Sequence, residues 1–273
     1  MTRTKLVTTC ATTLFVALSL VACDQGSGSS FARKSTTTSS QQSPVDDGTS
    51  SNGEENELPD DADTDDAGDA TGQPAPALSA VDINAARTAL GSLPTRGFSP
   101  NVPKYDRNEF GKPWSDDVTV DGGHNGCDTR NDILARDLTD VEFKPAKRNC
   151  IVTKGKLNDP YTNTTIDFKR GRKSSDLIPI DHVVALGDAW YSGAYQWDAD
   201  RRRNFANDPI NLQATNRESN TQKSAKNAAE WLPPNTAYQC EYVGRQITIK
   251  STYGLSVTPA EKNAMEKVLA TCS

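Results

Sequence analysis

Apolar residues recur at regular spacing only from about residue 80 onward, where the spacing alternates between helical and strand periods. Recurrence every three or four residues predicts helices, and strict alternation predicts strands. The expected helices cover residues 79–93, 128–138, 186–191, 198–205, 220–231, 236–251 and 258–271. The expected extended segments cover residues 150–152, 164–168, 178–184 and 210–213. This mixture of short helices and strands predicts an α+β fold.

The segment 24–80 has almost no large apolar side chains and is rich in Ser, Thr, Asp, Gly and Pro. Such a segment cannot bury enough apolar surface to offset the entropy lost on ordering. We therefore expect a disordered acidic tether over residues 23–78 and one domain over residues 79–273. Of the net charge of −6, the segment 24–80 carries −10, the first 23 residues +2 and the remainder +2. A weakly basic domain neither favours nor excludes binding to nucleic acid.

The first 22 residues predict an export signal. Arg3 and Lys5 precede an apolar run from Leu6 to Val21. The sequence Leu20-Val21-Ala22-Cys23 resembles a bacterial lipobox, in which the cysteine is lipid-modified and becomes the mature N-terminus. We therefore expect an exported lipoprotein that Cys23 anchors on the extracytoplasmic side of the membrane. The alternatives are an ordinary signal peptide with a chance cysteine, or a short transmembrane anchor.

Four cysteines remain in the expected domain: Cys127, Cys150, Cys240 and Cys272. An even number of cysteines in an exported domain predicts disulfides, and four cysteines allow three pairings. We favour Cys127–Cys150 with Cys240–Cys272, because each bond closes a local loop. A metal site built from these cysteines is less favoured, since none of them is spaced as Cys-x-x-Cys.

The residues with the clearest chemistry lie between 180 and 223. His182 follows Asp181 on an apolar segment, and Asn211, Asn220 and Lys223 follow in that order. This order resembles the HNH nuclease motif, in the variant whose last metal ligand is Asn rather than His. The chain is similar to secreted HNH-family proteins of the actinobacterial lipoprotein type over residues 125–273. The resemblance is strongest in Ile180–Leu186, Ala189–Ala194, Phe205–Leu212 and Asn220–Lys223.

The resemblance implies a ββα-metal (HNH-like) nuclease core with surrounding helices, stapled by disulfides. It implies that His182 is the general base, because a neutral imidazole can take a proton from water at neutral pH. Asp181 and Asn220 would hold one divalent ion, and their oxygen atoms suit Mg²⁺ (or Mn²⁺). Neighbouring side chains on a strand leave opposite faces, so a bend or strand end is needed for Asp181 and His182 to reach one site. Asn211 would tie down the loop that orients His182.

Two cationic side chains are expected to contact phosphate. Lys223 lies one helical turn beyond Asn220, and Arg130 follows the start of the expected helix 128–138. For Arg130, a surface salt bridge is an equal alternative. The basic stretches 169–173 and 201–203 would either meet a nucleic-acid backbone or be solvated surface. His124, in a glycine-rich turn, is expected to be exposed rather than catalytic.

These features predict a monomeric, metal-dependent nuclease that acts outside the cytoplasm on nucleic acid, on DNA rather than RNA. One alternative is a non-catalytic envelope lipoprotein or binding module on the same fold. The other is a phosphodiesterase that acts on small phosphodiesters. The sequence points to no protein partner.

Overall fold

The computed structural model describes residues 80–97, 99–145, 149–172 and 174–273. The expected signal peptide, the lipidation site Cys23 and the expected tether lie outside these residues, as do Ser79 and Lys173. Among the described helices, none has both the length and the apolar character needed to cross a membrane.

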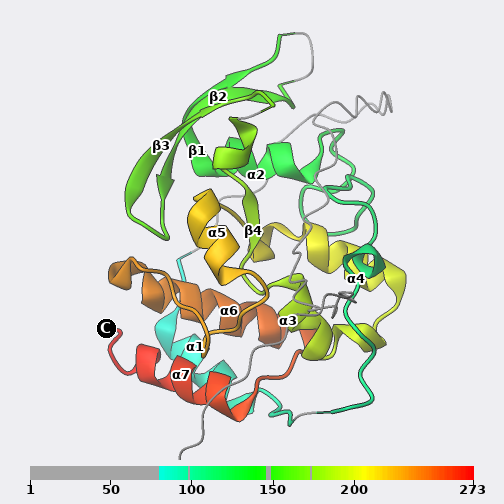
Figure 1. The fold of residues 1–273 in the computed structure, drawn as a ribbon, viewed down its shortest axis with the longest axis vertical. Helices are drawn as coiled ribbons and strands as arrows, with labels where there is room; N and C mark the ends of the chain where they lie inside the picture. Colours follow the sequence, from blue (N-terminus) through cyan, green and yellow to red (C-terminus); the bar gives the residue numbers. More distant parts are fainter. Residues whose placement is uncertain (1–79, 98, 146–148, 173) are drawn as a thin grey trace, which may run out of the picture. The chain divides into compact units, whose positions relative to one another are not determined.

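A three-stranded antiparallel sheet forms from segments that follow one another along the chain (Figure 1). Its strands are β1 (Leu138–Phe143), β2 (Val152–Asp159) and β3 (Thr164–Lys169), in the order β1-β2-β3. Helix α2 (Thr129–Asp137) precedes β1 and begins at Asp128, whose side chain accepts a hydrogen bond from the Asn131 amide. Ile133 and Leu134 of α2 share one core with apolar residues of the sheet. Strand β1 was not expected from the sequence.

A second sheet, of two strands, contains the expected site residues Asp181 and His182. Strands β4 (Ile180–His182) and β5 (Leu212–Ala214) are antiparallel, and His182 is paired with Leu212. The long connection between them carries α3 (Leu186–Tyr191) and α4 (Ala199–Asn207). Helix α5 (Arg217–Lys223) follows β5 directly. The chain therefore contains two antiparallel strands followed by a helix.

The extent of α5 differs from the expectation of a helix over residues 220–231. The side chain of Asn216 accepts a hydrogen bond from the Ser219 amide, so the helix begins at Arg217. The helix ends at Lys223 because Ser224 adopts a φ of 48°. The apolar residues after it, Ala228 and Trp231, pack against the core from turns.

The remaining helices build a second core. Helices α1 (Ile83–Ser92), α6 (Gln239–Tyr253) and α7 (Pro259–Leu269) pack together, and they share this core with residues of α3 and α4. Asp82 and Thr258 cap α1 and α7 with their side chains. Short 3-10 helices connect these elements at Arg107–Phe110, Ser175–Leu177, Ala194–Gln196, Pro209–Asn211 and Thr236–Tyr238.

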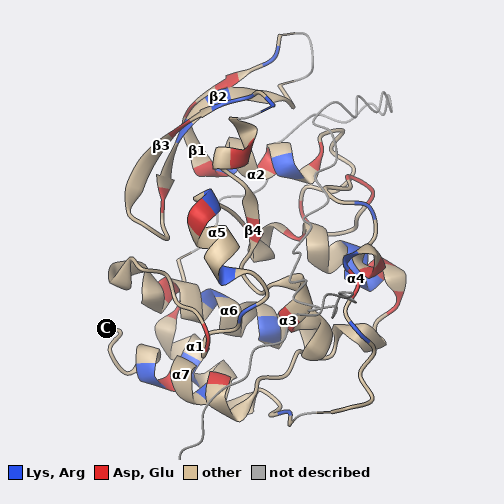
Figure 2. Ribbon diagram, viewed as in Figure 1, with Lys and Arg blue, Asp and Glu red and all other residues tan. Residues whose placement is uncertain are grey.

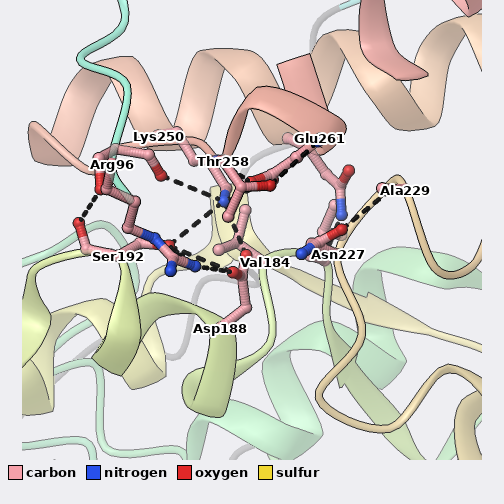
Figure 3. Close-up of polar contacts among 12 residues, drawn as sticks. Arg96, Val184, Asp188, Ser192, Asn227, Ala229, Lys250, Thr258 and Glu261 are labelled. Carbon is pink, nitrogen blue, oxygen red and sulfur yellow. Dashed lines mark hydrogen bonds and ion pairs between the residues drawn. The ribbon is translucent and has the colours of Figure 1, made fainter. Parts of the chain in front are cut away.

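Buried charged residues lie between the helices of this second core. The Nζ atom of Lys250 is 2.7 Å from Asp188 Oδ2 and 2.6 Å from Glu261 Oε1. Arg96 reaches the other oxygen of Asp188 at 3.5 Å. We call these four residues the ion cluster (Figure 3). It joins α3, α6 and α7, together with the chain before α2.

Both disulfides that the sequence favoured are present. Cys127–Cys150 links the chain before α2 to the chain before β2, with Cα atoms 5.2 Å apart. Cys240–Cys272 links the first turn of α6 to the residues after α7, with Cα atoms 5.8 Å apart. The expectation of an α+β fold with two disulfides is therefore confirmed.

Candidate active site

His182 lies at the end of β4, and the last turn of α4 holds its ring. Its Nε2 atom is 2.8 Å from the carbonyl oxygen of Ala206. A carbonyl oxygen only accepts hydrogen bonds, so the ring must donate through Nε2. In the neutral imidazole the lone pair is then on Nδ1, and this is the atom that can accept a proton.

The surroundings of His182 keep it uncharged. Its exposed fraction is 7%, and the ring of Trp114 stacks on it with centroids 6.0 Å apart. Burial, aided by the positive charge of Arg107, lowers the pKa of His182 to about 3. The imidazole is therefore neutral at physiological pH.

Asn211 cross-links the loop that follows His182. Its Oδ1 atom accepts a hydrogen bond from the Val184 amide at 2.8 Å, and its Nδ2 atom donates to the Val184 carbonyl at 3.3 Å. The carbonyl of Asn211 also accepts a hydrogen bond from the Val183 amide at 2.8 Å. Asn211 is fully buried. These bonds are of the kind expected from the sequence, in which this side chain fixes the backbone next to His182.

The Asp181 carboxylate is held on both oxygens by buried donors. The Tyr161 hydroxyl donates to Oδ2 at 2.6 Å, and Lys223 donates from Nζ to Oδ1 at 2.9 Å. The same Nζ donates to the carbonyl of His182 at 2.8 Å. The side chains of Asp181 and His182 therefore contact different elements, and Lys223 connects the two residues through the backbone of β4.

Asn220 lies one helical turn before Lys223 and is half-buried. Within the described part of the chain, no residue forms a hydrogen bond with its side chain. In those residues there is also no group of three or more His, Cys, Asp or Glu side chains arranged to hold a metal ion.

The expected pair of metal ligands can still be tested by its donor chemistry. Asp181 Oδ1 and the His182 carbonyl oxygen converge on the ammonium of Lys223, which is itself a cation. Anionic and carbonyl oxygens converging on a positive charge are the donor set that hard divalent cations take. Two oxygen atoms at Asp181 are therefore of the donor type that a divalent cation takes, whereas no hydrogen bond among the described residues joins Asn220 to them.

Arg130 packs against the chain that leads into β4. Its NH2 group donates to the carbonyl oxygens of Ser175 and Ile178, at 3.1 and 3.2 Å. These bonds position the segment before Asp181.

Four arginines of the two basic stretches are tied into the fold, whereas Lys169 and Arg172 are exposed. Arg170 donates to the Val152 carbonyl and to Asn131. Arg201 donates to the Tyr253 carbonyl, Arg202 contacts Glu109, and Arg203 pairs with Asp117 and Asp200. Acidic and basic residues are interspersed on β2 and β3 (Figure 2), where Lys154 and Lys156 pair with Glu142 and Asp140. These surfaces are mixed in charge rather than strongly basic.

His124, the other histidine, has an exposed side chain that lies 3.9 Å from Asp117. Sequence reasoning missed three groups that touch the candidate site: Tyr161, Trp114 and the carbonyl of Ala206. Tyr161 follows Pro160 in the turn between β2 and β3. The composition of this turn does not indicate a contact with β4. A backbone carbonyl has no signal in a sequence at all.

Comparison with known proteins gives two matches. Residues 128–268 match the family described as GmrSD restriction endonucleases, C-terminal domain. A protein of Arthroderma benhamiae described as an uncharacterized secreted protein is 37% identical over 203 residues, which cover 73% of this chain and 92% of the relative. No solved structure matches. The matched family region includes every residue of the candidate site except Trp114.

Proposed function

Because the chain belongs to the family of the GmrSD restriction endonuclease C-terminal domain, a restriction or HNH-type endonuclease family, we propose that it is a metal-dependent HNH nuclease that hydrolyses DNA outside the cytoplasm. The observation that carries this proposal is the hydrogen bond from His182 Nε2 to the Ala206 carbonyl. It leaves Nδ1 as a proton acceptor at the end of β4, beside the loop that Asn211 holds in place. The strand pair β4–β5 followed by α5 has the element order of a ββα-metal core.

His182 takes the proton of the attacking water on Nδ1. The imidazolium that forms keeps its Nε2–H bond to Ala206, so the ring does not have to turn as it becomes charged. Asn211 keeps the backbone of Val184 fixed during this step. Loss of the hydrogen bond to Ala206, or of Asn211, would displace the imidazole of His182. A displacement of about 1 Å can lower a rate by about 100-fold.

Asp181 and Asn220 are the residues that would hold one Mg²⁺ or Mn²⁺ ion. Such an ion, when bound, stabilises negative charge on the phosphate and on the leaving oxygen. Tyr161 holds the Asp181 carboxylate in one orientation through its hydroxyl, at 2.6 Å.

Export is supported by two features. The relative in Arthroderma benhamiae is described as secreted, and two disulfides persist only in an oxidising compartment. Attachment to the membrane through a lipid on Cys23 belongs to the same proposal. Incorporation of labelled palmitate by the wild-type chain, and its loss in Cys23→Ser, would support it; an unlabelled wild-type chain would overturn it.

The test compares the only two histidines in the chain. The purified protein with both disulfides formed is incubated with supercoiled plasmid and with RNA, in Mg²⁺ or in EDTA. We expect DNA cleavage that needs Mg²⁺, falls at least about 100-fold in His182→Ala and is unchanged in the exposed control His124→Ala. Equal activity of wild type and His182→Ala would overturn the assignment of the base.

The two alternative functions have their own outcomes in this assay. A folded protein that binds plasmid but cuts neither polymer would be a binding module. A protein that cuts a small phosphodiester such as bis(p-nitrophenyl) phosphate, but neither polymer, would be a small-molecule phosphodiesterase.

A further inference from the structure

Lys223 is fully buried, which lysine almost never is without a partner. Its ammonium lies 2.9 Å from Asp181 Oδ1 and 2.8 Å from the His182 carbonyl oxygen. One carboxylate and one ammonium leave this pocket electrically balanced. The other carboxylate oxygen is occupied by the neutral hydroxyl of Tyr161.

The same carboxylate is the one that would hold the divalent cation. A divalent ion added beside the ammonium would place three positive charges against one negative charge in the protein interior. Charges repel much more strongly there than in water, and an uncompensated buried charge is strongly unfavourable. The ammonium of Lys223 and the divalent cation therefore cannot both occupy Asp181.

Lys223 is placed so that its side chain can leave. It is the last residue of α5, and Ser224 follows outside the helix. Residues 224–226 are exposed, so solvent lies next to the backbone that carries the lysine. A lysine side chain is a flexible chain of four methylene groups that carries a strongly hydrated charge.

We propose that Lys223 Nζ occupies the cation position on Asp181 in the metal-free protein and that a divalent cation displaces it. This inference rests on the proposed function. Displacement has two consequences. The apparent affinity for the cation is reduced by the fraction of molecules in which Lys223 is withdrawn. The released ammonium is then available to pair with a phosphate of the substrate, so cation binding prepares the site for the anionic polymer.

The first test measures Mn²⁺ binding by calorimetry and by the electron paramagnetic resonance signal of free Mn²⁺. The proteins are wild type, Lys223→Met and the matched control Lys226→Met, which removes an exposed ammonium bonded only to the Gln222 carbonyl. If the withdrawn state makes up about a tenth of the molecules or less, Lys223→Met binds Mn²⁺ at least about tenfold more tightly. Lys226→Met should bind like wild type, and Asp181→Asn should abolish binding. Equal or weaker binding by Lys223→Met would overturn the proposal.

The second test uses the wild-type protein and does not depend on the folding of a variant. Acetylation of individual lysines by an N-hydroxysuccinimide ester is followed by mass spectrometry with and without Mn²⁺. Lys223 should be protected without metal and should react at least about tenfold faster with metal, since exposure follows displacement. Lys226 serves as the internal standard and should not change. A Lys223 rate that stays constant while Mn²⁺ binds would refute displacement.

Failure of this inference can be told apart from failure of the proposed function. Mg²⁺-dependent cleavage together with equal Mn²⁺ affinity in wild type and Lys223→Met would remove the displacement and leave the nuclease. Absence of Mn²⁺ binding in both proteins, together with absence of cleavage, would remove both.

Discussion

Replacing Lys250 by methionine removes the central charge of the ion cluster while keeping most of the side-chain volume. In the wild type, the ammonium bridges Asp188 and Glu261 at 2.7 and 2.6 Å, with no exposure to solvent (Figure 3). The substitution leaves two buried carboxylates, which only Arg96 partly compensates at 3.5 Å from Asp188. We expect a large loss of stability.

The magnitude follows from the geometry. At an effective dielectric constant of about 20, unit charges 2.7 Å apart attract by about 6 kcal/mol. Much of this attraction offsets the desolvation of the ammonium itself, and breaking a buried pair costs about 3–5 kcal/mol in practice. Burial raises the pKa of Glu261 and the charge of Lys250 opposes that rise, so the methionine variant raises the pKa further. The folded variant then binds a proton that the unfolded chain releases, and its stability falls as the pH rises.

Urea unfolding at pH 5 and pH 8, with the disulfides intact, measures both effects. Lys250→Met should lose about 3–5 kcal/mol at pH 8 and less at pH 5, where the raised pKa leaves a larger fraction of Glu261 protonated. Lys267→Met, which removes an exposed lysine from α7, should stay within about 0.5 kcal/mol of wild type. A loss below about 1 kcal/mol at pH 8, or a loss that does not shrink at pH 5, would refute this reasoning.

Three further predictions concern the sheet and the loop beside it. Burial raises the pKa of Asp132 to about 7, so this carboxyl should lower stability as the pH rises from about 4 to 7, by at most about 4 kcal/mol. Asp132→Asn should make the slope of stability against pH shallower in unfolding experiments, and an unchanged slope would contradict this. Replacing Cys127 and Cys150 by serine opens a loop with a sequence separation of 23 and should cost about 3 kcal/mol in thermal unfolding; an unchanged melting temperature would contradict it. Asn211→Ala leaves the buried Val184 amide without its partner and should cost about 1–3 kcal/mol. Cleavage by Asn211→Ala should fall even at temperatures where circular dichroism shows the variant fully folded.

Local signals in the sequence were enough to place most elements of the fold. Helices α4 and α7 lie where the sequence predicts helices, and Asp198 and Thr258 cap them through bonds within one turn. Strand β1 was missed because its pairing with β2 is interrupted by register shifts, with Asp140 at a φ of 53°. An irregular edge strand shows little alternation. The error at α5 has a similar origin, since apolar residues beyond Lys223 continue the helical spacing after the helix has ended.

The part of the candidate site that could be predicted is the part in which a side chain hydrogen-bonds to nearby backbone. The order of His182 and Asn211 along the chain is itself the signal, and the structure places Asn211 against the loop after His182. Tyr161 comes from a separate hairpin, and its contact with Asp181 depends on how the two sheets pack. The expectation that Lys223 faces phosphate followed from its helical spacing to Asn220. Spacing gives the face of a helix but not the depth at which the side chain ends, and here it ends on Asp181.

Lys223 and Lys250, both fully buried, differ in ways that suit one to the fold and the other to the proposed exchange. Lys250 lies within α6 and pairs with two carboxylates, so its departure would leave two negative charges buried. Lys223 ends a helix beside exposed residues and pairs with a single carboxylate, so one incoming cation replaces all of its charge. A divalent ion at the ion cluster would have to compete with Lys250 and Arg96 together, deep between helices. The proposed exchange is therefore confined to Asp181, next to the proposed base His182.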